Sequence, residues 1–338
     1  MVKYVITEMG FEGHLPENYN NMRVLEAQII ALNAYHLPLV KVLQEDKKYE
    51  GDVLVVLPKG NFKTDRGPNY QLLVPHKDLW IWLYEKYFDT VKHLKEKFNK
   101  VYFYQDGVLG WWNMCETRAQ VWWYNNLSAC DKIYCPNIGD VSYYKGLFPN
   151  NKIGVVRSIM LDTPLDKNKF LPKQDKTIIC GPFTYEYLGL NNAIIGHNFD
   201  NPIDIPPMGK GKMPMDSYEM APHLGVNYLE YMNWRDWMHN LSQYKLGLYM
   251  MRAWGAASFP LNCAYFSIPC VGNIKADTQK ILFPELSFDV YDTEGATNAV
   301  KKLKTDKDFY NHCSSTAKTI YKKEFSKEKF LELFKKDF

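Results

Sequence analysis

The sequence predicts an α/β protein of two Rossmann-like domains that face each other across a cleft. Its 338 residues are more than one core ordinarily holds and suit two domains. Short apolar runs alternate with segments of helical period through the first half, and the same alternation restarts near residue 176. Strands that alternate with helices are typical of parallel sheets joined by right-handed crossovers. Such sheets bind ligands at the carboxyl ends of their strands.

The first half shows these patterns in a regular order. The run DVLVVLP is apolar throughout, as in a strand that is buried on both faces. Val24, Leu25, Ile29 and Leu32 recur at helical spacing. The expected elements are a strand at residues 3–9, a helix at 24–32, a strand at 52–58, helices at 80–87 and up to 98, and strands at 100–105, 131–137 and 151–158.

The second half repeats the alternation after a segment rich in Pro, Asp and Lys at residues 158–175, which is the best linker candidate. The expected elements are a strand at 176–185, a short strand within 221–232, a helix at 233–244, a strand at 245–251, and a helix and strand within 259–273. We expect domains at residues 1–160 and 161–325, and a helix at 326–338 that returns to the first domain.

Composition and charge set limits on the protein class. The formal net charge of +3 permits a nucleic-acid partner without demanding one. The seven cysteines form no CxxC pair and are expected to be buried reduced thiols, and the histidines form no zinc motif, so we expect no metal and no cofactor. We see neither a signal peptide nor a run long enough to cross a bilayer. A cytoplasmic monomer is expected, in the host cytoplasm if the chain is viral.

The strongest chemical motif is the stretch GAASFPLNCAYFSIPCVGN, from Gly255 to Asn273. A loop of small residues leads into a helix, whose first backbone amides point outward and carry partial positive charge, as a pyrophosphate requires. Arg252 precedes the loop and is suited to a phosphate, while Asn262, one turn into the helix, is suited to a ribose hydroxyl. A plain strand–helix–strand unit whose helix only packs is the alternative.

This stretch resembles the nucleotide-sugar motif of GT-B glycosyltransferases, in which a small-residue loop precedes a helix that carries an acidic residue. Anchored on Pro269, the acidic position falls on Asn262 and a glycine of the motif falls on Ser267. The amide hydrogen-bonds hydroxyls more weakly than a carboxylate does. This departure leaves the identity of the donor open.

The resemblance extends over most of the chain in order and implies the rest of the donor site. CGPFTY resembles the glycine turn that approaches the donor phosphates, and backbone near Tyr231 is implied at the donor base. A flexible basic loop, MGKGKMPM at residues 208–215, is a further candidate contact for a diphosphate or a nucleic-acid backbone. The full set of predicted donor-binding residues is Gly181, Arg157, Tyr231, Arg252, Ser258, Phe259 and Asn262.

The stretch YFYQDGVLGWW places Asp106 on a glycine turn at the end of a strand. A glycosyl transfer that inverts the sugar carbon needs one base to take the proton of the acceptor hydroxyl. The stretch also resembles the strand-to-loop segment of phage DNA glucosyltransferases, in which an Asp follows an aromatic strand. Asp106 is thus a candidate catalytic base, with an exposed Asp-Gly turn as the alternative. Asp131 and Asp140 look structural.

The predicted acceptor side consists of Gly10, Glu12, His14, Trp111 and Trp112, with Glu8 as another acid of the first loop. Extruding a base from duplex DNA leaves a gap that aromatic side chains fill. With the resemblance to DNA glucosyltransferases, this favours double-stranded DNA as a partner and a 5-hydroxymethylpyrimidine as the acceptor. Packing in the core is the alternative for both tryptophans.

The sequence therefore predicts a glycosyltransferase that uses a nucleotide-diphosphate sugar, such as UDP-glucose, as co-substrate. Other functions of the same fold stay open: a glycan or lipopolysaccharide glycosyltransferase, and a sugar-nucleotide 2-epimerase. A non-catalytic binding protein is the remaining alternative. Product analysis and an Asp106 substitution would separate these hypotheses.

Overall fold

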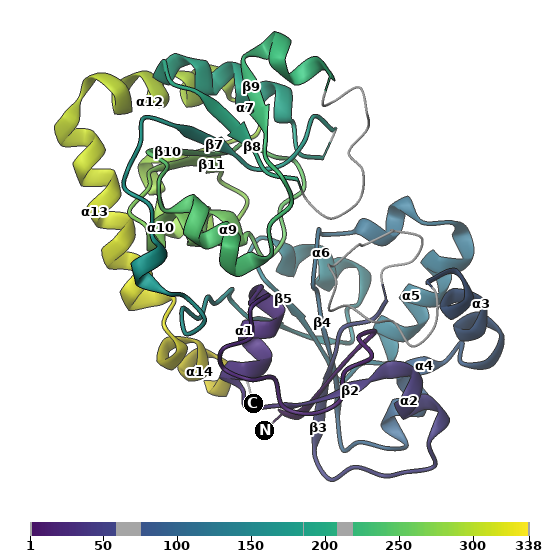
Figure 1. The fold of residues 1–338 in the computed structure, drawn as a ribbon. Helices are drawn as coiled ribbons and strands as arrows, with labels where there is room; N and C mark the ends of the chain where they lie inside the picture. Colours follow the sequence, from purple (N-terminus) through teal and green to yellow (C-terminus); the bar gives the residue numbers. More distant parts are fainter. Residues whose placement is uncertain (1, 59–75, 185, 208–218, 337–338) are drawn as a thin grey trace. The chain divides into compact units, whose positions relative to one another are not determined.

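The computed structural model describes residues 2–58, 76–184, 186–207 and 219–336, and the chain divides into two compact units. Unit 1 comprises Met1–Glu17, Leu25–Val156 and Leu331–Phe338, and unit 2 comprises Asn18–Val24 and Arg157–Phe330. The loop at 208–215 lies outside the described residues. Each unit is an α/β layer structure with its own parallel sheet (Figure 1).

Unit 1 holds a six-stranded sheet in the order β2-β1-β3-β4-β5-β6. All five strand pairs are parallel. Its strands are β1 (Val2–Thr7), β2 (Tyr35–Pro38), β3 (Asp52–Val55), β4 (Val101–Tyr104), β5 (Lys132–Cys135) and β6 (Lys152–Val155). Its helices are α1 (Val24–Ala31), α2 (Leu39–Gln44), α3 (His76–Lys86), α4 (Thr90–Lys95), α5 (Thr117–Ala129) and α6 (Asp140–Leu147), and the end of α14 (Lys327–Lys336) joins them.

Unit 2 also holds six parallel strands, in the order β12-β11-β10-β7-β8-β9. Its strands are β7 (Thr177–Ile179), β8 (Ile203–Ile205), β9 (Val226–Tyr228), β10 (Leu246–Tyr249), β11 (Cys270–Asn273) and β12 (Ser287–Phe288). Its helices are α7 (Gly189–Gly196), α9 (Trp234–Leu241), α10 (Ser258–Tyr265), α11 (Asp277–Leu282), α12 (Thr293–Thr305) and α13 (Lys307–Glu324).

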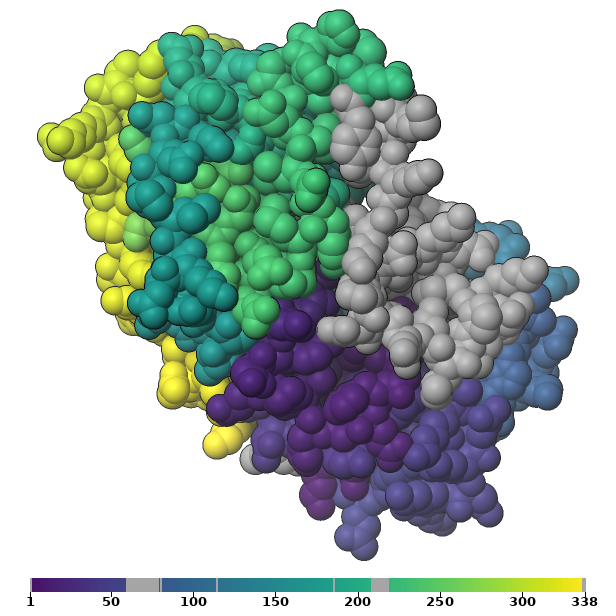
Figure 2. All heavy atoms as spheres, in the orientation of Figure 1, coloured from purple at the N-terminus to yellow at the C-terminus, as the bar shows by residue number. Residues whose placement is uncertain are grey.

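Helices cover both faces of the unit 2 sheet (Figure 1). Helices α7 and α12 pack together on one face, and α10 packs with α9, α11 and α13 on the other. The long α13, yellow in Figure 2, runs along one flank of this unit. The central strands β7 and β10 are therefore buried on both sides, which explains their continuous apolar sequence.

Three strands escape the sequence patterns, and one of them, β12, has only two residues. Strand β2 lies at a sheet edge, where Pro38 is tolerated because one side of the strand needs no ladder hydrogen bonds. Strand β8 carries Asp204 at its centre, a buried carboxylate that accepts a hydrogen bond from the Tyr244 hydroxyl at 2.7 Å. Strands β2 and β8 are short and contain a proline or a polar residue, so neither presents an apolar run.

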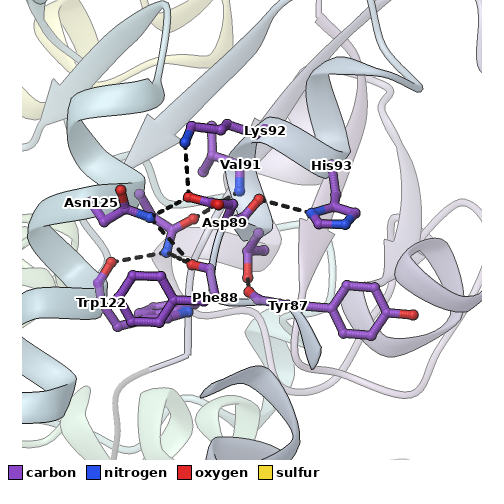
Figure 3. Close-up of polar contacts among 10 residues, drawn as sticks. Tyr87, Phe88, Asp89, Val91, Lys92, His93, Trp122 and Asn125 are labelled. Carbon is purple, nitrogen blue, oxygen red and sulfur yellow. Dashed lines mark hydrogen bonds and ion pairs between the residues drawn. The ribbon is translucent and has the colours of Figure 1, made fainter. Parts of the chain in front are cut away.

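A buried amide ties the helical layer of unit 1 together, and Figure 3 labels three of its partners, Phe88, Val91 and Trp122. The Nδ2 atom of Asn126, on α5, donates to the carbonyls of Phe88 and Trp122 at 3.0 and 2.9 Å. Its Oδ1 atom accepts from the Val91 amide at 2.8 Å. Asn126 is fully buried and thus fixes the α3–α4 connection on α5 through satisfied hydrogen bonds.

Candidate active site

The strand order of unit 2 defines where a ligand is expected. Read from β9, the order is 3-2-1-4-5-6 within the unit, the order of dinucleotide-binding Rossmann domains. The order reverses between β7 and β10, and ligands of open α/β sheets bind outside the carboxyl ends of the strands at that point. Gly181 follows β7 and Arg252 follows β10, so both predicted donor residues stand at this switch point.

The segment after β10 is held by polar side chains on several sides. Asn192, on α7, accepts from the Met250 amide and donates to the Met250 carbonyl, both at 2.9 Å. The hydroxyl of Ser158 donates to the Ala256 carbonyl, and that of Thr278 donates to the Ala257 carbonyl at 2.9 Å. With these carbonyls bonded to protein hydroxyls, the loop is an ordered platform in front of α10.

Helix α10 begins at this platform. Its N-cap residue, Ala257, has a positive φ of 46° and makes no side-chain capping bond. The first amides of a helix have no partner within the helix, so those that follow Ala257 are suited to an anion. Ser258 is exposed at the first helical position, while Phe259 is buried.

Asn262 lies one turn into α10 and is only 4% exposed. Its Oδ1 atom is buried and has no hydrogen-bond partner among the described residues. Helical side chains lean toward the helix N-terminus, so this amide lies over the first turn of α10. A buried carbonyl oxygen without a partner is costly, and a donor from a ligand would satisfy it.

The remaining predicted donor residues have mixed surroundings. The Arg252 guanidinium lies 5.7 Å from the centre of the Tyr291 ring. Arg157 is paired with Glu324, 3.4 Å from Nη1 to the carboxylate, so its charge is shared with a protein partner. Tyr231 is half-buried in the segment that follows β9. Of the two arginines, Arg252 is the one that stands just before the loop leading into α10.

The glycine at the end of β7 has a local structural reason. Gly181 has a positive φ of 87°, and a Cβ atom added there would stand 2.2 Å from the ring of Tyr187. Burial raises the pKa of Tyr187 to about 12, so its hydroxyl stays protonated. Packing of this ring explains the glycine without a ligand.

In unit 1, Asp106 follows β4 and is half-buried on a turn. Gly107 has a φ of 141°, a conformation that side-chain-bearing residues rarely adopt. The carboxylate therefore stands at the carboxyl edge of the parallel sheet, as the sequence predicts for the candidate base.

The loop after β1 contains the predicted acceptor residues Gly10, Glu12 and His14. Gly10 is half-buried, Glu12 is paired with Lys41, and His14 is exposed with its ring edge-on to Tyr35 at 5.3 Å. Glu8, in the same loop, is only 8% exposed. Since the order of unit 1 reverses between β1 and β3, this loop stands at that unit's switch point.

The loop after β1 is held by a histidine that the sequence patterns do not single out. His36, on β2, is fully buried and its Nδ1 atom donates to the Phe11 carbonyl at 2.5 Å. Its Nε2 atom therefore accepts from the Thr7 hydroxyl at 2.9 Å. Its backbone also pairs with Gly13 in both directions. Burial lowers the pKa of His36 to about 4, which keeps the ring neutral.

The two tryptophans lie elsewhere than the acceptor prediction assumes. Trp111 and Trp112 are each 5% exposed, in a one-turn 3₁₀ helix that belongs to the hydrophobic core. Trp112 stacks on Trp123 at 5.5 Å and Trp111 meets the same ring edge-on at 4.7 Å. As a correction, core packing describes both side chains in this structure, because the short helix turns them inward onto α5.

Other expected features concern metals, thiols and membranes. Within the described ranges, no three His, Cys, Asp or Glu side chains gather as metal ligands would. None of the seven cysteines forms a disulfide bond, and all but Cys115 are buried. No helix among the described residues is both long and apolar enough to span a bilayer.

No protein-family model matches the chain, and no curated protein matches it in sequence. The solved structures nevertheless define its class: the chain has the GT-B fold of glycosyltransferases. The likeness is one of fold, because sequence identities are only 10–11%.

Three of the similar structures illustrate the match. Trehalose-6-phosphate synthase OtsA has a TM-score of 0.64 at 11% identity and covers 99% of this chain and 98% of its own. Sucrose-phosphate synthase from Thermosynechococcus elongatus has a TM-score of 0.59 at 10% identity, covering 98% and 97%. TarM from S. aureus, crystallised with UDP, has a TM-score of 0.62 at 11% identity; the match covers 88% of this chain but only 57% of TarM.

Proposed function

We propose that this protein is a glycosyltransferase that takes a sugar from a nucleotide-diphosphate donor, with UDP-glucose as the best candidate. One observation carries the proposal: Asn262, on the helix that follows the switch-point strand β10, has a buried oxygen without a partner among the described residues. Among the similar structures, one described as trehalose-6-phosphate from E. coli is bound with UDP-2-fluoro glucose and TarM is in complex with UDP, which supports the donor class.

The residues around α10 suit the parts of such a donor. The backbone amides after Ala257 would bind the diphosphate, with Arg252 as the nearby cation. A ribose hydroxyl would donate to the Oδ1 atom of Asn262 and remove its unsatisfied state. Tyr231 stands in the segment proposed to flank the base.

For the chemical step we propose Asp106 as the base that takes the proton of the acceptor hydroxyl while that oxygen attacks the sugar carbon. The leaving nucleoside diphosphate departs from the opposite face, so the sugar is inverted. The work on trehalose-6-phosphate synthase concerns transfer with retention, so the anomeric form of the product is a direct test of this step.

The proposed acceptor is a 5-hydroxymethylpyrimidine in double-stranded DNA. The net charge of +3 is compatible with it. Phe11 and Ile138 follow β1 and β5 at the carboxyl edge of unit 1 and are 42% and 61% exposed. Large apolar side chains of this kind fill the gap that an extruded base leaves.

The experiment supplies UDP-glucose with a labelled sugar and two DNA duplexes that differ only in hydroxymethylcytosine against cytosine. We expect label on the hydroxymethylated duplex alone, with an inverted linkage by nuclear magnetic resonance. Transfer to another hydroxyl compound but to neither duplex would overturn the DNA acceptor and leave the transferase. No turnover of, and no thermal protection by, any nucleotide sugar would overturn the function itself.

A further inference from the structure

A buried polar network lies directly beside the candidate base. Gln105, the residue before Asp106, is fully buried, as is Tyr144 on α6. The Tyr144 hydroxyl donates to Oε1 of Gln105 at 2.7 Å, and Nε2 of Gln105 donates to the Gly107 carbonyl at 2.9 Å. The side chain of Gln105 thus bridges over Asp106 to the residue that follows it.

The same network reaches a buried carboxylate and the sheet. Asp140, at the start of α6, is 1% exposed, and its Oδ2 atom lies 3.1 Å from Nδ2 of Asn137 and 3.5 Å from Nε2 of Gln105. The backbone N–H of Gln105 donates to the Tyr134 carbonyl at 2.9 Å, which extends the hydrogen bonding between β4 and β5 by one residue past β4. Gln105 is therefore held by β5, by α6 and by its own turn.

These contacts fix the chain on both sides of Asp106. Gln105 is held by hydrogen bonds of both its backbone and its side chain. The Gly107 carbonyl is held by the side-chain Nε2 atom of Gln105. Asp106 has little freedom between two fixed points, although Gly107 is intrinsically free to adopt other backbone conformations. A fully satisfied buried network of this kind rigidifies the segment that it holds.

We propose that Gln105 and Tyr144 are positioning residues, which hold the 105–107 turn so that the Asp106 carboxylate meets the acceptor hydroxyl. The inference rests on the proposed function, since it assigns the turn a role in proton transfer. A general base works only within hydrogen-bond reach, and a displacement of about 1 Å costs on the order of 100-fold in rate. A rigid 105–107 turn should therefore give a higher kcat than a mobile one.

The test compares Tyr144→Phe with Tyr143→Phe. Tyr143 is the neighbour on α6, but its hydroxyl accepts from Asn113 at 3.1 Å instead of bonding Gln105, so the control removes the same atom from the same helix. Hydrogen exchange of the amides at 105–108 is measured first. We expect it to accelerate about tenfold in Tyr144→Phe, the factor that one lost hydrogen bond gives, and to stay unchanged in Tyr143→Phe.

Transfer kinetics are then measured at a temperature where both variants are fully folded. We expect kcat to fall at least about tenfold in Tyr144→Phe while the KM for the donor holds, and Tyr143→Phe to match the wild type. A loss confined to stability, with equal kcat in both variants, would overturn the positioning role. If the wild type transfers no sugar, the proposed function fails separately, and unchanged exchange in Tyr144→Phe would still overturn the network's hold on the turn.

Discussion

The two units have sheets of the same size, yet their candidate reactive groups stand at different places. In unit 2 the loop before α10 follows β10, one of the two strands at the switch point. In unit 1 the candidate base follows β4, while the order reverses between β1 and β3. Glu8 stands at that reversal and Asp106 one strand beyond it.

This difference shows what topology alone can locate. A nucleotide site uses backbone amides and a helix terminus, which the strand order places without regard to side chains. A catalytic base depends on one carboxylate and on the turn that aims it. The proposed donor site therefore follows from the fold, and the proposed base depends on local contacts such as those of Gln105.

The largest expected effect concerns the choice between two carboxylates. Asp106→Asn should lower kcat by roughly 100-fold or more, because a general base contributes on the order of 10²–10⁴-fold, and donor affinity should hold. Glu8→Gln, at the switch point, should lower kcat less than about tenfold. Steady-state transfer assays check both variants. A larger loss in Glu8→Gln than in Asp106→Asn would move the base to the switch point and remove the contrast between the units.

The second prediction concerns the loop after β1 and its histidine. His36 has a folded pKa of about 4 against 6.5 in the unfolded chain. The unfolded state thus binds more protons between these values, so the stabilisation is complete above pH 6.5 and is lost as the pH falls toward 4. The loss should reach about 3 kcal/mol.

Urea unfolding at pH 7 and pH 4.5, for the wild type and for His36→Gln, measures this dependence. The wild type should lose more stability on acidification than the variant does. Equal losses in the two proteins would show that His36 titrates normally and does not clamp the loop.

The third prediction uses one buried amide in each unit. Asn192 bonds Met250 beside the loop before α10, whereas Asn126 bonds the α3–α4 connection of unit 1. Each Ala variant leaves buried backbone groups unpaired and should lose about 2 kcal/mol of stability. Only Asn192→Ala should also weaken UDP binding. Calorimetry with UDP separates them, and equal affinity in both variants would contradict a donor platform held by Asn192.

The smallest expected effect lies at Asn262. Asn262→Leu removes the buried unpartnered oxygen at nearly constant volume, so the folded protein should lose little or no stability. UDP affinity should fall about tenfold with the lost hydrogen bond. Thermal unfolding and calorimetry give the two values. Unchanged UDP affinity would place the ribose elsewhere and reduce the donor site to backbone contacts.

The fold class follows from the sequence because continuous apolar strands alternate with helices in both halves, and the two six-stranded parallel sheets confirm it. Strands β2, β8 and β12 do not follow, since β2 ends in Pro38, β8 carries Asp204 at its centre and β12 has only two residues. The order of the strands in each sheet cannot be predicted from these local patterns either, because it depends on pairings between distant segments. The switch points thus become visible only in the structure.

The site divides in a similar way. Asp106 is recognisable from its strand and turn, and its catalytic role stays a prediction. The inward turn of Trp111 and Trp112 is invisible in a sequence that shows only two aromatics after a glycine. Gln105 gives no signal at all, since its partner Tyr144 lies 39 residues away. Long-range polar contacts of this type have no short motif.

The most direct test of a donor site at α10 is a calorimetric titration of UDP into Ser258→Asp and Ser258→Asn. Ser258 is exposed at the first position of α10. The helix dipole stabilises a carboxylate at this position, but the same carboxylate repels a diphosphate.

We predict that Ser258→Asp is at least as stable as the wild type and binds UDP at least about tenfold more weakly, while Ser258→Asn binds it nearly as well. Wild-type affinity for UDP in Ser258→Asp would contradict a donor site at α10.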